Sequence, residues 1–320
     1  MSLDYVIVRS HGLLQHLLKR GDYEQLITGD KKICDFIEYS QVREEYPLER
    51  KLSMITERFI SRIKFLQRIS DEKMVNFYQA FLDFLELENI KFKLRHIYGR
   101  YDRERYHPYS HFIDLEVLKR IKKEKNLIEI LAGTPYEMNE EVSKRLGSIL
   151  EKEAYLEALY YRYFRGTINQ YKSLRILSKY INYEVIRRLT YWVIVLGEKK
   201  AKELLRNNVL DGLLPYGVMR KFNIGKNNID IKLLLEFFKL DEEGLRLIRG
   251  KKISGLMKLI RVKELNMLKE GARNMSLTII YVYYYMQLCK EEMYNLHKIL
   301  LGKEIGLPED VILDAIIISL

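Results

Sequence analysis

Proline and glycine are scarce in this chain of 320 residues, which contains 5 prolines and 17 glycines. Average proteins carry about 5% proline and about 7% glycine, so this sequence is short of the residues that form turns. An all-β sandwich, which depends on many turns, is therefore close to excluded. Long helices are the favoured architecture.

Cysteine is scarcer still, and the two cysteines, Cys34 and Cys289, stand far apart without a CxxC partner. Neither a disulfide framework nor a cysteine zinc site is available, which indicates a reducing compartment. The first residues lack the basic and apolar pattern of a secretory signal. The most apolar runs, 189–196 and 277–289, are shorter than the roughly 20 residues of a membrane-spanning helix, so no such helix is expected.

Positive charge, by contrast, is in excess, because Lys plus Arg number 55 and Asp plus Glu 44, a net charge of +11. Acids interrupt both basic stretches, 119–125 and 246–263, as on a solvated helix face. Tyrosines also alternate with arginines in a way that would suit single-stranded RNA, at Arg95, Tyr98, Arg100, Tyr101, Arg103, Arg105, Tyr106 and Tyr109. A cytosolic helical RNA-binding or scaffold protein is therefore kept as the alternative function.

Apolar residues recur at spacings of three and four along most of the chain, the pattern of helices with one buried stripe. The predicted helices cover residues 5–18, 54–66, 74–97, 150–177, 185–195, 233–247 and 275–301. Turn-forming residues separate them at 46–47, 106–110, 133–136, 214–217 and 225–228. The expected fold is therefore all-α, with almost no room for strands.

A weak internal triplication divides the chain into repeats of about 100 residues. Three helical segments carry an acid three residues before a polar position: Glu86 with Asn89, Glu184 with Arg187, and Glu292 with Asn295. A glycine follows ten residues after the first two polar positions, and Gly302 and Gly306 follow the third. Pro-Tyr pairs recur at 108–109 and 215–216. We predict three helical modules, at residues 1–120, 121–225 and 226–320.

The repeated pairs have a simple physical interpretation. Residues three apart lie on the same face of a helix, so Glu86 with Asn89 and Glu292 with Asn295 each present a carboxylate and an amide together. Such a pair can hold a neighbouring helix end, and the following glycine supplies the left-handed cap that stops the helix. The commoner explanation of such a motif is a cluster of hydrogen-bonded polar side chains at a helix end that has no role in binding.

The motifs of the common helical enzymes are missing. The stretch from Gly244 to Gly250-Lys251 is one residue too long for a Walker phosphate loop, and no HExxH, GxSxG or DDxxD-like box occurs. We therefore expect no catalytic residue, no cofactor and no small-molecule substrate.

A metal site is also not expected. Glu104-x-x-His107 has the spacing found in di-iron bundles, but Pro108 places it in a turn and the other required ligands are missing. His107 and His111, with Asp114 nearby, leave a loop metal site open as an alternative. An exposed polar turn is the commoner explanation of this group.

Three segments of the sequence resemble a family of ATPase components, the C subunits of archaeal-type ATP synthases, which are equivalent to the d subunits of vacuolar-type proton ATPases. They are Tyr5-x-x-x-Arg9 before Leu13-Leu14, Glu86-x-x-Asn89-Ile90-Lys91 through Leu94-Arg95, and Glu292-x-x-Asn295-Leu296 through Gly302-Lys303-x-x-Gly306-Leu307-Pro308. The resemblance extends over essentially the whole chain, and the last segment is the most specific. Arg187 departs from the asparagine of the family pattern, and His297 stands where the family usually has arginine.

This resemblance implies a funnel of three pseudo-threefold-related helical modules that acts as a non-catalytic rotor component. It would sit on the membrane proteolipid (c) ring, receive the foot of the central shaft, and couple ion-driven rotation to ATP synthesis or the reverse. The implied partners are the ring and the central-shaft subunits, with the membrane stator subunit as a further candidate and no specific nucleic acid. The implied location is peripheral, on the cytoplasmic face of the cell membrane.

Overall fold

The computed structural model describes residues 3–99, 105–197, 199–201 and 231–318. Some features singled out in the sequence lie outside these ranges: Tyr101, Glu104, the Pro-Tyr pair at 215–216, and the predicted module boundary between residues 225 and 226.

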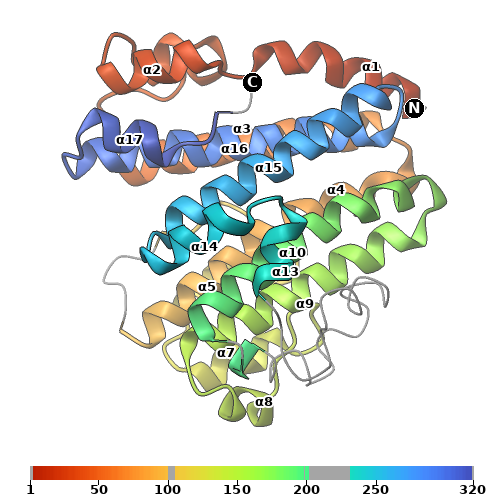
Figure 1. Ribbon diagram of the computed structural model, residues 1–320, viewed down its shortest axis with the longest axis vertical. Helices are drawn as coiled ribbons and strands as arrows, with labels where there is room; N and C mark the ends of the chain where they lie inside the picture. Colours follow the sequence, from red (N-terminus) through yellow and green to blue (C-terminus); the bar gives the residue numbers. More distant parts are fainter. Residues whose placement is uncertain (1–2, 100–104, 198, 202–230, 319–320) are drawn as a thin grey trace. The chain divides into compact units, whose positions relative to one another are not determined.

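Every regular element in these ranges is helical, which confirms the all-α prediction (Figure 1). The α-helices are α1 (Leu3–Leu13), α2 (Arg20–Thr28), α3 (Leu48–Ile69), α4 (Val75–Leu82), α5 (Phe84–Ile97), α6 (Leu115–Arg120), α7 (Glu124–Leu131), α8 (Glu140–Arg145), α9 (Ile149–Gln170), α10 (Ser178–Leu196), α13 (Ile231–Phe237), α14 (Asp241–Arg249), α15 (Ile253–Asn274), α16 (Ile279–Glu304) and α17 (Glu309–Ala315). Short 3-10 turns form η1 (Leu14–His16), η2 (Ile33–Asp35), η3 (Ile37–Tyr39), η4 (Glu72–Met74) and η5 (Lys172–Leu177). Within the described ranges, no helix combines the length and apolarity needed to cross a membrane.

Helix boundaries differ from the sequence prediction in several places. The helix predicted over 5–18 ends at Leu13, before the 3-10 turn η1, and the helix predicted over 233–247 is divided into α13 and α14. The helix predicted over 74–97 is divided at Asp83 into α4 and α5, and the helix predicted over 150–177 ends at Gln170 before the 3-10 turn η5. The basic stretch 246–263 is not a simple solvated face, because Leu256 and Ile260 on its helical part are buried. Periodicity located these helices but not the points at which they bend or change type.

The chain divides into two compact units, and the first consists of residues 1–78 and 265–320. In this unit α16 packs along α3 and α1, and α17 packs on α2 (Figure 1). The three-and-four spacing of Ile55, Phe59 and Ile63 places these side chains on the buried face of α3. Ile280 and Tyr283 of α16 are buried in the same unit.

The second unit consists of residues 79–264. Here α9 packs against both α5 and α10, and α13 packs against α10 (Figure 1). The division into three modules at 120/121 and 225/226 stays a prediction.

Buried charges join the central helices of the second unit. Glu157 of α9 accepts hydrogen bonds from Lys91 Nζ of α5 at 2.7 Å and from Trp192 Nε1 of α10 at 3.0 Å. Arg188 of α10 lies 3.7 Å from the same carboxylate. Burial alone would raise the pKa of Glu157, but Arg188 and Lys91 lower it to about 2.

This pKa predicts a specific acid sensitivity. A carboxyl whose pKa is lower in the folded state stabilises fully above its unfolded pKa, near 4.3, and the stabilisation is lost as the pH falls toward about 2. Between about pH 5 and pH 2, wild type should lose about 2–3 kcal/mol more free energy of unfolding than Glu157→Gln. Urea denaturation across this pH range measures the difference. Glu129→Gln, at an exposed position of α7, is the matched control, and its loss of stability in acid should equal that of wild type. Equal acid sensitivity in all three proteins would contradict the prediction.

Candidate functional site

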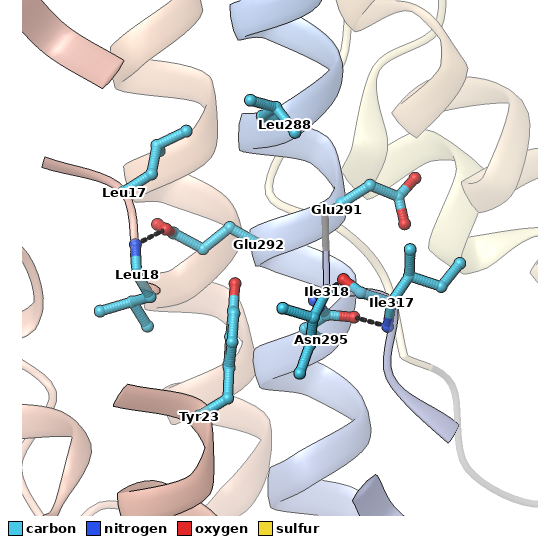
Figure 2. Close-up of a pocket in the computed structure, with 9 residues that line it drawn as sticks. All are labelled: Leu17, Leu18, Tyr23, Leu288, Glu291, Glu292, Asn295, Ile317 and Ile318. Carbon is cyan, nitrogen blue, oxygen red and sulfur yellow. Dashed lines mark hydrogen bonds between the residues drawn. The ribbon is translucent and has the colours of Figure 1, made fainter. Parts of the chain in front are cut away.

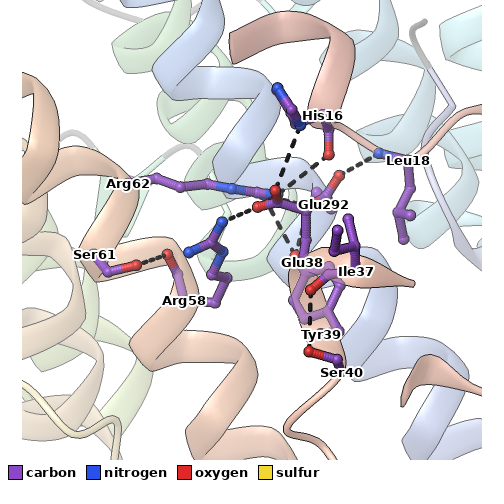
Figure 3. Close-up of polar contacts among 10 residues, drawn as sticks. All are labelled: His16, Leu18, Ile37, Glu38, Tyr39, Ser40, Arg58, Ser61, Arg62 and Glu292. Carbon is purple, nitrogen blue, oxygen red and sulfur yellow. Dashed lines mark hydrogen bonds and ion pairs between the residues drawn. The ribbon is translucent and has the colours of Figure 1, made fainter. Parts of the chain in front are cut away.

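Glu292 of α16 is a buried carboxylate that ties four segments of the first unit together (Figure 3). Its Oε2 accepts the backbone N–H of Leu18 at 2.6 Å, just before α2. Its Oε1 accepts the hydroxyl of Tyr39 at 2.5 Å, in η3, and an N–H of Arg62 in α3. Glu292 is 2% exposed and Arg62 6%, so this ion pair lies out of contact with water.

The geometry matters because a buried charge without its partner is costly. Removing one member of such a pair typically costs about 3–5 kcal/mol, whereas the intact pair is held by directional, charge-assisted hydrogen bonds. Burial and the negative charge of Glu292 also raise the pKa of Tyr39, which keeps its hydroxyl protonated as a donor. Glu292 therefore fixes how α2, η3 and α3 are arranged around α16.

A second carboxylate, Glu38, extends this network toward the surface. It pairs with Arg58, with Arg62 at 3.2 Å, and with His16 at 3.5 Å (Figure 3). The preceding residue, Ile37, is 85% exposed. The network thus holds the 3-10 turn η3 against α3 and presents an apolar side chain to solvent.

Asn295, one helical turn beyond Glu292, holds the C-terminal segment. Its amide Nδ2 donates to the carbonyl of Ile317 at 2.7 Å, and its Oδ1 accepts the N–H of Ile317 at 2.9 Å (Figure 2). This two-way bond satisfies both backbone groups of one buried residue. Glu292 and Asn295 therefore attach an early and a late part of the chain to the same helix.

A small cavity lies beside these residues, lined by Leu17, Leu18, Tyr23, Leu288, Glu291, Glu292, Asn295, Ile317 and Ile318 (Figure 2). Its volume is about 10 Å³, and a second cavity between α9 and α10 has the same volume. That space holds about one water molecule, whereas small-molecule sites measure about 300–1,000 Å³. Neither cavity can take a nucleotide or an organic cofactor.

Glu86 and Asn89 of α5 hold a different segment in the second unit. Glu86 Oε1 accepts the N–H groups of His111, Phe112 and Ile113 at 2.8, 2.9 and 3.0 Å. Asn89 Nδ2 donates to the carbonyls of residues 107 and 109 at 3.0 and 3.1 Å, and its Oδ1 accepts the N–H of residue 107 at 2.7 Å. Both side chains are about 1% exposed. The pair attaches an irregular segment to the helix, not a helix end as the sequence suggested.

The third pair, Glu184 and Arg187 of α10, is built differently. Arg187 donates to Glu264 Oε2 of α15 at 2.7 Å, and Arg261 donates to the other oxygen of Glu264 at 2.7 Å. Glu184 is buried. The departure from asparagine thus has a physical counterpart, because a guanidinium pairs with a carboxylate where an amide would hold a peptide group. The three pairs engage three different sets of partners.

Each of the three helices is followed by a glycine in a positive-φ conformation, but Gly197, with a ψ value of 155°, does not form the left-handed helical cap that the repeat predicts. The φ values are 67° at Gly99, 82° at Gly197 and 69° at Gly306. Gly302 has another role, because it lies inside α16 against α17. A Cβ at this position would stand 2.8 Å from Cγ1 of Ile312, so only glycine permits this approach.

The alternatives that the sequence left open gain no support from the geometry. In the described part of the chain, no group of three or more His, Cys, Asp or Glu is placed to hold a metal ion. Burial lowers the pKa of His107 to about 4, and Asp114 caps α6 through the N–H groups of residues 116 and 117. Tyr109, a candidate for base stacking, is buried, and its hydroxyl donates to Asp83 at 2.6 Å.

Sequence reasoning missed the partners of the predicted residues, above all Arg62, Asp83 and Glu264. A signal for Arg62 was present, since it continues the apolar stripe of Ile55, Phe59 and Ile63 at helical spacing. An arginine in such a stripe indicates a buried cation, and a buried cation needs a buried acid. Nothing in the sequence indicates that this acid lies 230 residues away at Glu292.

Gly302→Ala should lower the free energy of unfolding by about 1–3 kcal/mol, because the new methyl group overlaps Ile312. Gly166→Ala in α9 is the matched control, since its Cβ would meet nothing within 4 Å and alanine favours a helix by about 1 kcal/mol. Thermal or urea denaturation of both variants measures the two effects. If both variants were more stable than wild type, α17 would be able to move away from the new methyl group without loss of stability, and the prediction would be wrong.

Asn89→Ala and Asn295→Ala should each destabilise by about 1–3 kcal/mol, because each leaves buried backbone groups unpaired. Asn126→Ala on an exposed position of α7 is the control and should leave the urea midpoint nearly unchanged. Unaltered midpoints in both test variants would mean that the two amides are free to contact a partner.

One family model matches almost the whole chain. The family model for the ATP synthase (C/AC39) subunit matches residues 6–315 and so includes all three pairs. A search of curated proteins finds no match. The chain belongs to the ATP synthase (C/AC39) subunit family, as the three sequence segments indicated.

Proposed function

We propose that this chain is a non-catalytic central-stalk component that connects the membrane proteolipid ring to the central shaft of an A/V-type ATP synthase. Rotation of the ring would pass through it to the shaft, and in the direction of ATP hydrolysis the shaft would turn the ring. The observation that carries the proposal is the family match over residues 6–315, the range that holds all three pairs. The protein would be peripheral to the membrane, on its cytoplasmic face.

The contacts between helices in the interior of the protein are suited to transmitting torque. Directional ion pairs cross between helices at Glu292 and Arg62, at Glu157 and Lys91, and at Arg187 and Glu264. Hydrophobic contacts alone are non-directional, whereas hydrogen bonds lose strength steeply when their geometry is disturbed. These pairs would oppose sliding of one helix along another under torque.

Three modules with a common plan remain part of the proposal. Two of the pairs attach a backbone segment that follows their own helix, at residues 107–113 and at Ile317. A positive-φ glycine follows each of the three helices. These shared features support modules centred on α5, α10 and α16.

Exposed apolar side chains at the end of α16 and in α17 offer a surface for a partner protein. Ile305 is 70% exposed, and Leu307 and Val311 are about 40% exposed. Stable interfaces bury about 1,200 Å² or more in total, with an apolar centre and a polar rim. A socket that holds its partners through a full rotation needs contacts of this stable kind.

Reconstitution tests the proposal. Head, shaft and membrane ring are assembled with this chain, without it, or with the double variant Ile305→Glu and Val311→Glu, and ion-driven ATP synthesis is measured. Omission should abolish synthesis while the head still hydrolyses ATP. The double variant should fold, because both positions are exposed, and should weaken assembly by placing charge in an apolar contact.

Two further measurements make the outcome decisive. Circular dichroism and thermal denaturation establish that the double variant is folded. Lys303→Glu, on the exposed end of α16, changes the net charge by the same amount and sign and so controls for charge alone. Full coupling in the absence of the chain would refute the socket role.

A further inference from the structure

Residues 105–113, here called the 105–113 segment, are anchored by two buried carboxylates that the rotor role does not explain. Glu86 binds three of its N–H groups. Asp83, 0% exposed, accepts the hydroxyl of Tyr109 at 2.6 Å and lies 3.0 Å from Nδ1 of His111. The hydroxyl of Tyr163 in α9 donates to the other oxygen of Asp83 at 3.0 Å.

The charge balance of this anchor is unusual. Within the described ranges, neither lysine nor arginine forms an ion pair with Asp83, and its cationic partner is His111. Elsewhere in the chain, buried carboxylates such as Glu157 and Glu292 pair with a lysine and an arginine, which keep their charge at any physiological pH. A histidine keeps its charge only below its pKa, so the counter-charge of Asp83 depends on pH.

We propose that Asp83 and His111 form a proton-dependent clasp that holds the 105–113 segment on α5 tightly when His111 is protonated and more loosely when it is neutral. Neutral imidazole still donates one hydrogen bond through Nδ1–H, so the segment does not detach. It loses the ionic part of the attachment, and Asp83 is left as a buried charge without a cation. The ring of His111 is one third exposed, so protons exchange with solvent directly.

Among the residues that the structure describes, the two charged groups that act on His111, Asp83 and Glu86, shift its pKa in the same direction. The hydrogen bond and charge of Asp83 raise the pKa of His111, and Glu86 adds to this effect. Burial raises the pKa of Glu86 as well. Burial also raises the pKa values of Tyr109 and Tyr163, so both phenols stay neutral.

The direction of the pH effect follows from these shifts. A histidine with a raised pKa contributes its stabilisation fully below its unfolded pKa of about 6.5, and loses it as the pH rises through the folded value. The pKa of Glu86 is also raised, so its contribution to the free energy of unfolding likewise decreases as the pH rises through its folded pKa. The clasp should tighten in acid and loosen above neutrality.

Amide hydrogen exchange on the full chain tests this device. Exchange is measured between pH 6 and pH 8.5 and corrected for the intrinsic chemical rate. In wild type, protection of the amides of residues 111–113 should fall about three-fold or more relative to amides in the middle of α9. His111→Asn keeps a donor near Nδ1 without a charge, and its protection should not depend on pH beyond that of α9.

Controls separate the clasp from a general effect of pH. His16→Asn removes an exposed histidine beside Glu38 in the first unit and should behave as wild type. An NMR titration of the His111 ring in wild type requires no variant to fold, and it should give a pKa above 6.5. A His111 pKa at or below 6.5, or equal loss of protection in the 105–113 segment and in α9, would overturn the proposal.

Discussion

A carboxylate shielded from water must be met by cations or hydrogen-bond donors, and this requirement organises both units of the protein. Glu292 satisfies it by collecting donors from three other segments, and Glu86 does so at one of its two oxygens, Oε1, with consecutive backbone N–H groups. Glu157 does so with a lysine and a tryptophan. Each acid lies on a long helix, so the helix becomes the fixed element to which other parts of the chain attach. The apolar faces provide most of the stabilisation, but the buried acids decide which segments meet.

The same motif produces different attachments because the polar residue and its partner differ, while the acid is common to the repeats. At Glu86 and Asn89 the partner is backbone, so this part of the attachment does not depend on the side chains of the segment. At Arg187 the partner is the carboxylate of Glu264, so the attachment depends on one particular side chain. A repeated sequence pattern therefore indicates a repeated helix with a polar face, and the structure built on that face can still differ between repeats.

Helical class and most helix positions could be predicted from the sequence, because periodicity is a local property. The glycines that follow α5, α10 and α16 were predictable for the same reason, since a helix stop is decided within a few residues. The partners of the buried acids were not. Leu18 and Glu292 are 274 residues apart, and no local rule relates them. Arg62 and Asp83 were visible only as polar residues inside apolar stripes, which indicates that a partner exists without identifying it.

Buried ion pairs are not the most stable way to fill these positions, since apolar residues of similar volume are often equally good or better. Their value here would be to fix the register of the helices, that is, the position of one helix along its neighbour. An apolar helix contact tolerates a small slip at little cost, whereas the bonds to Glu292 fail together if α16 moves relative to α3 or α2. A slip that breaks them leaves Arg62 and Glu292 buried without partners, which is strongly destabilising. Such a contact suits a protein proposed to transmit torque between two partners, because even a small displacement of the helix raises the free energy steeply.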